Sequence, residues 1–170
     1  MLSLITGGCR SGKSTHALAL ASASPALRKF FIATAQALDD EMRARIAHHR
    51  RFRPAEFQTI EEPRTLSATI GSLYGRADIL VVDCLTLWVS NLLKENSDEA
   101  ILAEADALAR VLVQAPFSTV VVTDEVGWGI VPENPVARRF RDVLGWTNQK
   151  VACAADEVLL MAAGYPLRLK

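Results

Sequence analysis

The chain has 170 residues, which is enough for one domain with a well-buried core and too few for two domains of ordinary size. Half of the residues are hydrophobic and 19 basic residues balance 19 acidic ones, so the composition gives no indication of a nucleic-acid-binding surface. No apolar run reaches the length of a membrane span, and the N-terminus lacks the basic region of a signal peptide. The three cysteines are widely spaced and contain no C-x-x-C pair, so we expect reduced thiols in a cytoplasmic protein.

A phosphate-binding motif comes first along the chain. Residues 7–14 read G-x-x-x-x-G-K-S, with a short apolar run before them and good helix formers after them, which is the context that a P-loop requires. Its glycines let the backbone approach a phosphate at a helix N-terminus. Lys13 supplies a cation for the terminal phosphates, and the Ser14 hydroxyl can coordinate Mg²⁺. The predicted contacts with a nucleoside triphosphate are Gly7, Gly8, Cys9, Arg10, Ser11, Gly12, Lys13 and Ser14.

Strands and helices alternate along the rest of the chain. The P-loop helix is predicted to end near Ala23, because Ser24-Pro25 cannot comfortably continue it. Apolar, β-branched runs predict strands at 29–34, 57–60, 78–83 and 118–124. Helices are predicted at about 39–49, 65–74, 84–93, 99–113 and 136–155, with Gly145 as a weak point in the last, and a terminal hairpin at 157–162 and 167–170. This order indicates a single α/β domain over residues 1–170, P-loop NTPase-like, with a mainly parallel sheet flanked by helices and a C-terminal antiparallel hairpin.

Two acidic residues follow central strands. A P-loop enzyme needs an acid at the end of a neighbouring strand to hold Mg²⁺, and both Asp83 and Asp124 meet this requirement. Asp83 follows the more continuous hydrophobic strand and is the preferred metal ligand with Ser14, while Asp124-Glu125 is the competing pair. Either aspartate could instead cap the following helix. The loop at 125–135 contains glycine and proline and is long for a compact domain, so we expect it to be functional.

A histidine with a basic segment after it is the second candidate site. Met42, Ile46 and His49 share one face of the predicted helix, whereas His48 points about 100° away. A histidine there, followed by arginines at 50, 51 and 53, could attack a phosphorus while the guanidinium groups neutralise the departing charge. The alternative is a solvated helix end whose cations suit the helix dipole. The residue pattern alone favours the alternative.

Longer motifs give the chain a family resemblance. The segments read T-G-G-x-R-S-G-K-S at 6–14, I-A-T-A-Q-x-x-D-x-E-M-x-x-R-I-x-x-H at 32–49, R-x-R-P at 51–54, T-x-E-E-P at 59–63, D-C-L-T-x-W at 83–88, D-E-V-G-x-G-I-V-P-E-N at 124–134, N-Q-x-x-A at 148–152 and A-D-E-V at 155–158. With these motifs the chain resembles, from end to end, the bifunctional adenosylcobinamide kinase / adenosylcobinamide-phosphate guanylyltransferase family of late cobalamin biosynthesis. The R-I-x-x-H segment and the loop after residue 124 are more specific than the P-loop.

The resemblance implies two reactions on one corrinoid substrate. First, ATP or GTP would donate its γ-phosphoryl group to adenosylcobinamide, with Mg²⁺ as cofactor. Next, a histidine would take GMP from GTP, release pyrophosphate and pass the GMP to adenosylcobinamide phosphate, which gives adenosylcobinamide-GDP. The family motif places that histidine at His49 and implies a homotrimer. It places further nucleotide contacts at Thr34, Ala35, Gln36, Arg50, Arg51, Phe52, Arg53, Glu61 and Asp83.

Two alternatives stay open at this point. The chain could be a P-loop kinase of another small alcohol, in which His49 is only structural. It could also be a regulatory protein that binds GTP without transferring any part of it.

Overall fold

A seven-stranded sheet forms the centre of the molecule. The computed structural model describes all residues from 1 to 170. The strands lie in the order β3-β2-β4-β5-β1-β6-β7, and only the pair β6–β7 is antiparallel. The predicted mainly parallel α/β fold with a terminal hairpin is therefore confirmed. The strands are β1 (Leu2–Gly7), β2 (Lys29–Ala33), β3 (Phe57–Glu61), β4 (Ile79–Asp83), β5 (Ser118–Val122), β6 (Glu157–Ala162) and β7 (Tyr165–Arg168).

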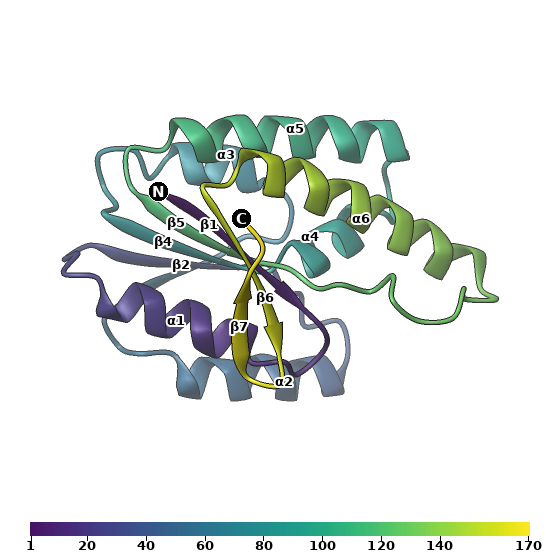
Figure 1. Ribbon diagram of the computed structural model, residues 1–170, viewed down its shortest axis with the longest axis horizontal. Helices are drawn as coiled ribbons and strands as arrows, with labels where there is room; N and C mark the ends of the chain where they lie inside the picture. The colour runs from purple at the N-terminus through teal and green to yellow at the C-terminus, as the bar shows by residue number, and fades with distance from the viewer.

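Helices cover both faces of the sheet (Figure 1). One face carries α1 (Lys13–Ala23) and α2 (Asp40–Phe52). The other face carries α3 (Leu66–Gly71), α4 (Leu85–Leu92), α5 (Asp98–Gln114) and α6 (Pro135–Ala154). Because parallel strands are buried on both faces, they read as continuous apolar runs in the sequence. No helix is long and apolar enough to cross a membrane.

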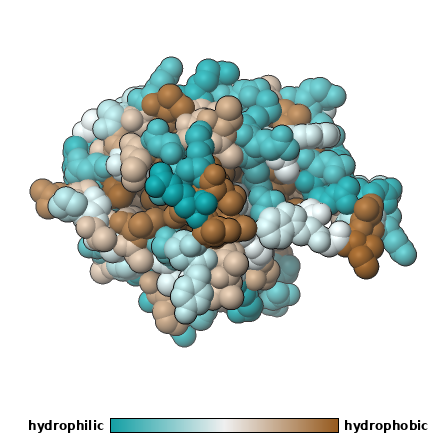
Figure 2. All heavy atoms as spheres, viewed as in Figure 1, coloured by the Kyte–Doolittle hydropathy of each residue, from teal (hydrophilic) through white to brown (hydrophobic).

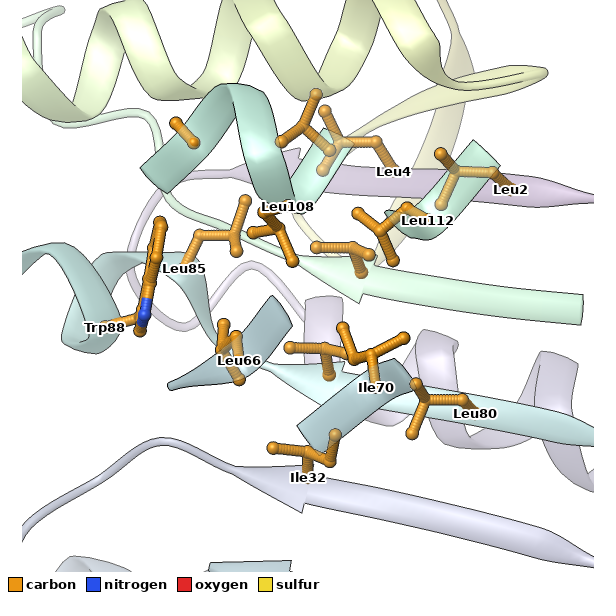
Figure 3. Packing of buried hydrophobic residues seen from close by; sticks show 14 of the residues in the cluster. Leu2, Leu4, Ile32, Leu66, Ile70, Leu80, Leu85, Trp88, Leu108 and Leu112 are labelled. Atoms are coloured by element: carbon orange, nitrogen blue, oxygen red, sulfur yellow. The ribbon is translucent and has the colours of Figure 1, made fainter. Parts of the chain in front are cut away.

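Alternation along each strand divides the core into two clusters. The larger has 26 buried residues and includes Leu4, Leu80 and Trp88 (Figure 3), between the sheet and the four helices α3–α6. The smaller has 11 residues and includes Ile5 and Val81, beside α1. Consecutive strand residues point to opposite faces, so neighbours such as Leu4 and Ile5 serve different clusters.

Several element ends differ from the sequence prediction. α2 continues to Phe52 instead of ending near residue 49, because nothing stops the helix before Arg53 and Pro54. α3 ends at Gly71 instead of continuing to residue 74, and the chain reaches Gly75 through turns. β7 begins two residues early because Ala163 and Gly164 form a tight turn, with φ values of 50° and 88°. β5 ends at Val122 rather than at residue 124. Gly145 does not interrupt α6.

The strand order places three carboxyl ends side by side. β5 lies between β1, which leads into the P-loop, and β4, which ends at Asp83. Beyond the end of β5, Glu125 still donates its backbone N–H to the Gly7 carbonyl at 3.1 Å. The acids after β5 therefore stay beside the P-loop strand, and the fold brings both acidic segments to one edge of the sheet.

Candidate active site

The P-loop turns tightly between β1 and α1. Gly7 has a φ of 147°, and a Cβ at this position would lie 2.4 Å from the backbone oxygen of Met161. Gly12 takes a left-handed conformation, with a φ of 96°, at the N-cap of α1. The N–H of Gly164, in the β6–β7 turn, donates to the Ser11 carbonyl at 3.0 Å. The terminal hairpin thus supports the loop, whose amides lie at a helix N-terminus as anion binding requires.

Lys13 is buried and lies across this loop. Its ammonium donates to the Gly8 carbonyl at 2.6 Å and lies 2.6 Å from Oδ1 of Asp124. The lysine side chain is 8% exposed and that of Asp124 is 26% exposed. Asp124 therefore pairs with the P-loop cation. It caps no helix, because a loop follows it.

Asp83 and Ser14 form the second pair at this edge. Withdrawal from water raises the pKa of Asp83, and hydrogen bonding by the neighbouring Ser14 hydroxyl opposes this and lowers it. The positive charges of His49 and Arg53 act in the opposite direction and lower this pKa. The N-cap of α4 is Cys84, so Asp83 is not a helix cap either. This carboxylate makes no ion pair with a basic side chain within 4 Å, a state that favours a cation beside it.

Ser14 and Asp83 together suit a magnesium ion that is also bound by phosphate. Mg²⁺ prefers oxygen ligands and in nucleotide sites takes one or two of them from the protein. The hydroxyl of Ser14 and the carboxylate of Asp83 are neighbouring oxygen donors. No group of three or more His, Cys, Asp or Glu side chains forms a cage for a metal, so phosphate and water would complete the shell. The donor set fits Mg²⁺.

Thr34 supports the segment beyond the end of β4. Its hydroxyl donates to the Cys84 carbonyl at 2.7 Å and accepts from the Cys84 N–H at 2.9 Å, while the residue is fully buried. The Asn91 amide donates to the Thr34 carbonyl at 2.8 Å. The Thr34 hydroxyl is therefore engaged with Cys84, and a nucleotide contact by Thr34 stays a prediction. Ala35 and Gln36 follow in the loop beyond β2 at the same edge.

His49 lies on a helix that is well capped but superficial. Asp39 caps α2 by accepting the N–H of Met42 at 2.7 Å, and none of the α2 residues is buried. The ring of His48 contacts that of Phe52 with centroids 4.6 Å apart, so His48 is engaged along its own helix. His49 is exposed, and its charge acts on Asp83. The predicted histidine and the predicted metal ligand thus share one electrostatic environment.

An open groove of about 460 Å³ lies beside α2. Arg50 forms an ion pair with Glu61, and Arg53 donates to the Thr59 hydroxyl at 2.7 Å. The guanidinium of Arg53 also lies 3.8 Å from the centre of the Phe31 ring, and burial lowers its pKa. The groove is lined by Arg50, Arg53, Pro54, Ala55, Phe57, Thr59 and Glu61. Three predicted nucleotide contacts therefore meet here, whereas Arg51 and Phe52 are exposed.

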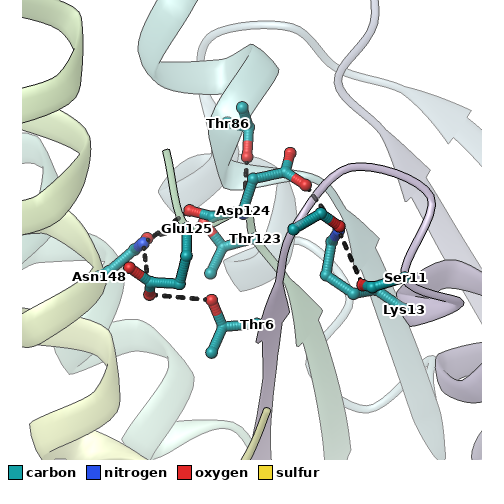
Figure 4. Close-up of polar contacts among 9 residues, drawn as sticks. Thr6, Ser11, Lys13, Thr86, Thr123, Asp124, Glu125 and Asn148 are labelled. Carbon is teal, nitrogen blue, oxygen red and sulfur yellow. Dashed lines mark hydrogen bonds and ion pairs between the residues drawn. The ribbon is translucent and has the colours of Figure 1, made fainter. Parts of the chain in front are cut away.

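Asn148 belongs to the N-Q-x-x-A motif, but the sequence analysis assigns it no role at the site. Asn148 is buried on the core-facing side of α6, where its amide contacts the segment from Thr123 to Glu125 (Figure 4). The signal in the sequence is a polar residue at a position where the helical period calls for an apolar one, between Leu144 and Val151.

Comparisons with known proteins place the chain in a family. The family model described as "Cobinamide kinase / cobinamide phosphate guanyltransferase" matches residues 3–169. The chain is 44% identical to the bifunctional adenosylcobalamin biosynthesis protein CobU of Salmonella typhimurium, over all of both chains. It is 44% identical to the bifunctional adenosylcobalamin biosynthesis protein CobP of Pseudomonas aeruginosa, over all of this chain and 98% of that protein.

Solved structures with little sequence similarity share the fold. The RadB recombinase matches with a TM-score of 0.52 at 19% identity, over 94% of this chain and 73% of that one. The flagellar accessory protein FlaH of Methanocaldococcus jannaschii matches with a TM-score of 0.53 at 12% identity, over 99% and 77% of the two chains. The P-loop NTPase-like fold is thus confirmed, and these two likenesses indicate the fold alone.

Proposed function

The chain belongs to the cobinamide kinase / cobinamide phosphate guanyltransferase family, and from that premise we propose which of its residues carry the two reactions. It is a bifunctional transferase that phosphorylates cobinamide and then attaches a guanylyl group to cobinamide phosphate. The observation that carries the residue assignment is that the P-loop and Asp83 lie at one edge of the sheet, where the charge of His49 lowers the pKa of the Asp83 carboxylate.

In the kinase step, the γ-phosphoryl group of ATP or GTP passes to the aminopropanol hydroxyl of adenosylcobinamide. The P-loop amides and the Lys13 ammonium hold the phosphates and stabilise the negative charge that spreads over the transferring group. Ser14 and Asp83 would hold Mg²⁺, which when bound would neutralise charge on the phosphate oxygens. This role is supported by their proximity and by the absence of an ion pair between Asp83 and a basic side chain.

In the transferase step, an imidazole nitrogen of His49 attacks the α-phosphorus of GTP. A P–N bond forms, the bond to the pyrophosphate oxygen breaks, and pyrophosphate leaves. The phosphate of adenosylcobinamide phosphate then attacks the same phosphorus, the P–N bond breaks, and adenosylcobinamide-GDP is released with His49 restored. The covalent intermediate divides one difficult transfer into two easier ones.

The groove beside α2 binds part of the nucleotide in this scheme. Arg50 and Arg53 bring positive charge to it, and the buried Nε of Arg53 has no hydrogen-bond partner in the protein, which leaves a donor for a ligand. Glu61 holds Arg50 in place. We retain Ala35, Gln36, Arg51 and Phe52 as further contacts because they flank these groups.

Labelling with GTP that carries ³²P at the α-phosphorus tests the assignment. We expect the wild-type protein to acquire a covalent label that is labile in acid and stable in base. His49→Ala should lose the label and still phosphorylate cobinamide, whereas the matched control His48→Ala should keep both properties. A labelled His49→Ala protein would refute the assignment of the histidine, and an unlabelled wild type would refute the covalent mechanism.

The functional unit is a cytoplasmic homotrimer, with both reactions in one domain. A single domain is supported by the continuous sheet, and a cytoplasmic location by three cysteines that form no disulfide. Trp128 is 72% exposed and Ile130 is 97% exposed, in a segment that projects from the body, and Figure 2 shows hydrophobic atoms at this projection. Such a surface suits a subunit contact. Light scattering should give three times 18.5 kDa, and Ile130→Asp should reduce that mass.

A further inference from the structure

The amide of Asn148 contacts three consecutive residues beyond β5. Its Oδ1 accepts from the Thr123 hydroxyl at 2.7 Å. Its Nδ2 donates to the Asp124 carbonyl at 3.0 Å and lies 3.4 Å from Oε1 of Glu125. Asn148 is 7% exposed, so all three contacts lie away from bulk water. An apolar side chain of the same size could fill the space but could make none of these bonds.

Two threonines hold the same segment from other elements. The Thr6 hydroxyl, on β1, donates to Oε1 of Glu125 at 3.0 Å. The Thr86 hydroxyl, on α4, accepts the backbone N–H of Asp124 at 2.9 Å. The two acids therefore cannot rotate freely about the end of β5. Their backbone is attached to β1, α4 and α6 at once.

This attachment decides where each carboxylate points. Glu125 points toward Thr6 and Asn148, while Asp124 points the other way, toward Lys13 (Figure 4). Adjacent residues in extended chain project to opposite sides, so fixing Glu125 on one side fixes Asp124 on the other. The Asp124 carboxylate then reaches the Lys13 ammonium at 2.6 Å. The lysine is kept at the mouth of the P-loop by a group whose own position depends on α6.

We propose that Asn148 is a positioning residue for phosphoryl transfer, which acts through Asp124 on the P-loop lysine. The proposal rests on the kinase activity stated above and adds to it the dependence of Lys13 on a side chain of α6. Catalysis by a P-loop depends on placing charge correctly before the reaction, and a displacement of about 1 Å can cost about a hundredfold in rate. Asn148 touches neither nucleotide nor corrinoid in this role.

The substitution Asn148→Asp gives a readout that packing alone would not change. It keeps the shape of the side chain, but an ionised carboxylate can donate to neither the Asp124 carbonyl nor Glu125 and repels the carboxylates of both residues. Thr6 and Thr86, which also bind this segment, are neutral, and Lys13 contacts it with a positive charge through Asp124. When the introduced carboxyl group is protonated, it can again donate to the Asp124 carbonyl. Burial beside two acids favours that protonated form.

Steady-state phosphorylation of cobinamide should therefore be measured for the full-length protein at pH 6 and pH 8. We expect Asn148→Asp to lower kcat by about tenfold or more at pH 8, to change KM for the nucleotide by less than about threefold, and to recover toward wild type at pH 6. The neighbouring exposed residue provides a matched control, Gln149→Glu, which should behave like wild type at both pH values. Bound nucleotide per chain normalises each rate to folded protein.

Thr123→Val provides a second test, which serves if Asn148→Asp does not fold. It removes the hydroxyl that fixes the amide orientation, so we expect a loss of kcat by itself, smaller than the tenfold loss expected of Asn148→Asp; where both variants fold, the two losses should not add. The proposal would be overturned by a wild-type kcat in both variants or by a loss of kcat in Asn148→Asp that is equal at the two pH values. An equal loss of kcat in Gln149→Glu would overturn it too. Failure of the wild type itself to phosphorylate cobinamide would instead overturn the proposed function.

Discussion

Removing the charge of Asp124 should make the protein bind nucleotide more tightly. In the structure the Lys13 ammonium is paired with Asp124, yet a P-loop lysine must contact the β- and γ-phosphates when nucleotide binds. Asp124 therefore competes with the phosphates for the same cation. The substitution Asp124→Asn leaves the lysine without its anionic partner, so that the phosphates become the best partner available.

The size of the effect follows from the burial of the pair. With Lys13 8% exposed and Asp124 26% exposed, the ion pair is more protected than a surface pair and less than a fully buried one. Its net contribution is about 1 kcal/mol, at the upper end of the range for exposed pairs. Releasing that competition should lower the Kd for GTP by about fivefold, since about 1.4 kcal/mol corresponds to tenfold.

Isothermal titration calorimetry with GTP, in Mg²⁺ and separately in EDTA, measures this change. Asp106→Asn is the matched control, because Asp106 also pairs with a lysine, Lys150, at 2.7 Å. It removes the same charge from a different part of the protein, so its Kd should equal that of the wild type.

A weaker affinity in Asp124→Asn would refute the reasoning. Weakening only in the presence of Mg²⁺ would mean that Asp124 helps to hold the metal, and weakening in both buffers would mean that it orders the loop. An equal gain in Asp106→Asn would show that overall charge, and not the pair with Lys13, controls binding.

Three further predictions concern separate parts of the chain. Cys9 is exposed within the P-loop, so a maleimide should block binding of a fluorescent nucleotide, GTP should protect the protein, and Cys9→Ala should be resistant, as read by intact mass and fluorescence. Gly7→Ala should cost about 1–3 kcal/mol in unfolding free energy and lower Tm by roughly 5–10 °C, because its Cβ would meet backbone 2.4 Å away; Gly8→Ala, with no atom within 4 Å, should keep the wild-type Tm. The Arg28 guanidinium lowers the pKa of Asp78 from 3.8 to about 2, so their pairing stabilises the fold above about pH 4 and this contribution is lost as the pH falls toward 2. Asp78→Asn should therefore lower Tm at neutral pH, with the difference from wild type vanishing near pH 2; a constant difference would contradict this account.

The strands and the P-loop could be predicted because their signals are local. β4 and β5 are buried on both faces, so their sequences are continuous apolar runs, and the phosphate-binding loop is defined by eight consecutive residues. The buried face of α5 also follows directly from the spacing of Ile101, Ala105 and Leu108. In each case the residues that decide the structure lie within one element, so their spacing along the sequence is enough to predict it.

Contacts between side chains of different elements could not be predicted in the same way. Thr6 and Glu125 are 119 positions apart, and nothing local in either segment indicates that they meet. The sequence favoured Asp83 over Asp124 as the metal ligand, but only the strand order shows that Asp124 is the acid that pairs with Lys13. Thr34 belongs to a motif that suggests a ligand contact, while its hydroxyl is bonded to Cys84.

The superficial position of α2 has a consequence for how this protein can change under selection. None of its residues is buried, so the helix that carries His49 adds little to the free energy of unfolding, and in the proposed mechanism substitutions around the histidine act mainly on guanylyl transfer. Lys13, by contrast, is 7% exposed within the P-loop, where its ammonium contacts Gly8 and Asp124, so substitutions there also remove buried polar contacts. With these proposed roles the two activities differ in evolvability: guanylyl transfer can be lost, retuned or regained by drift in one exposed helix, while the kinase half is constrained by folding itself.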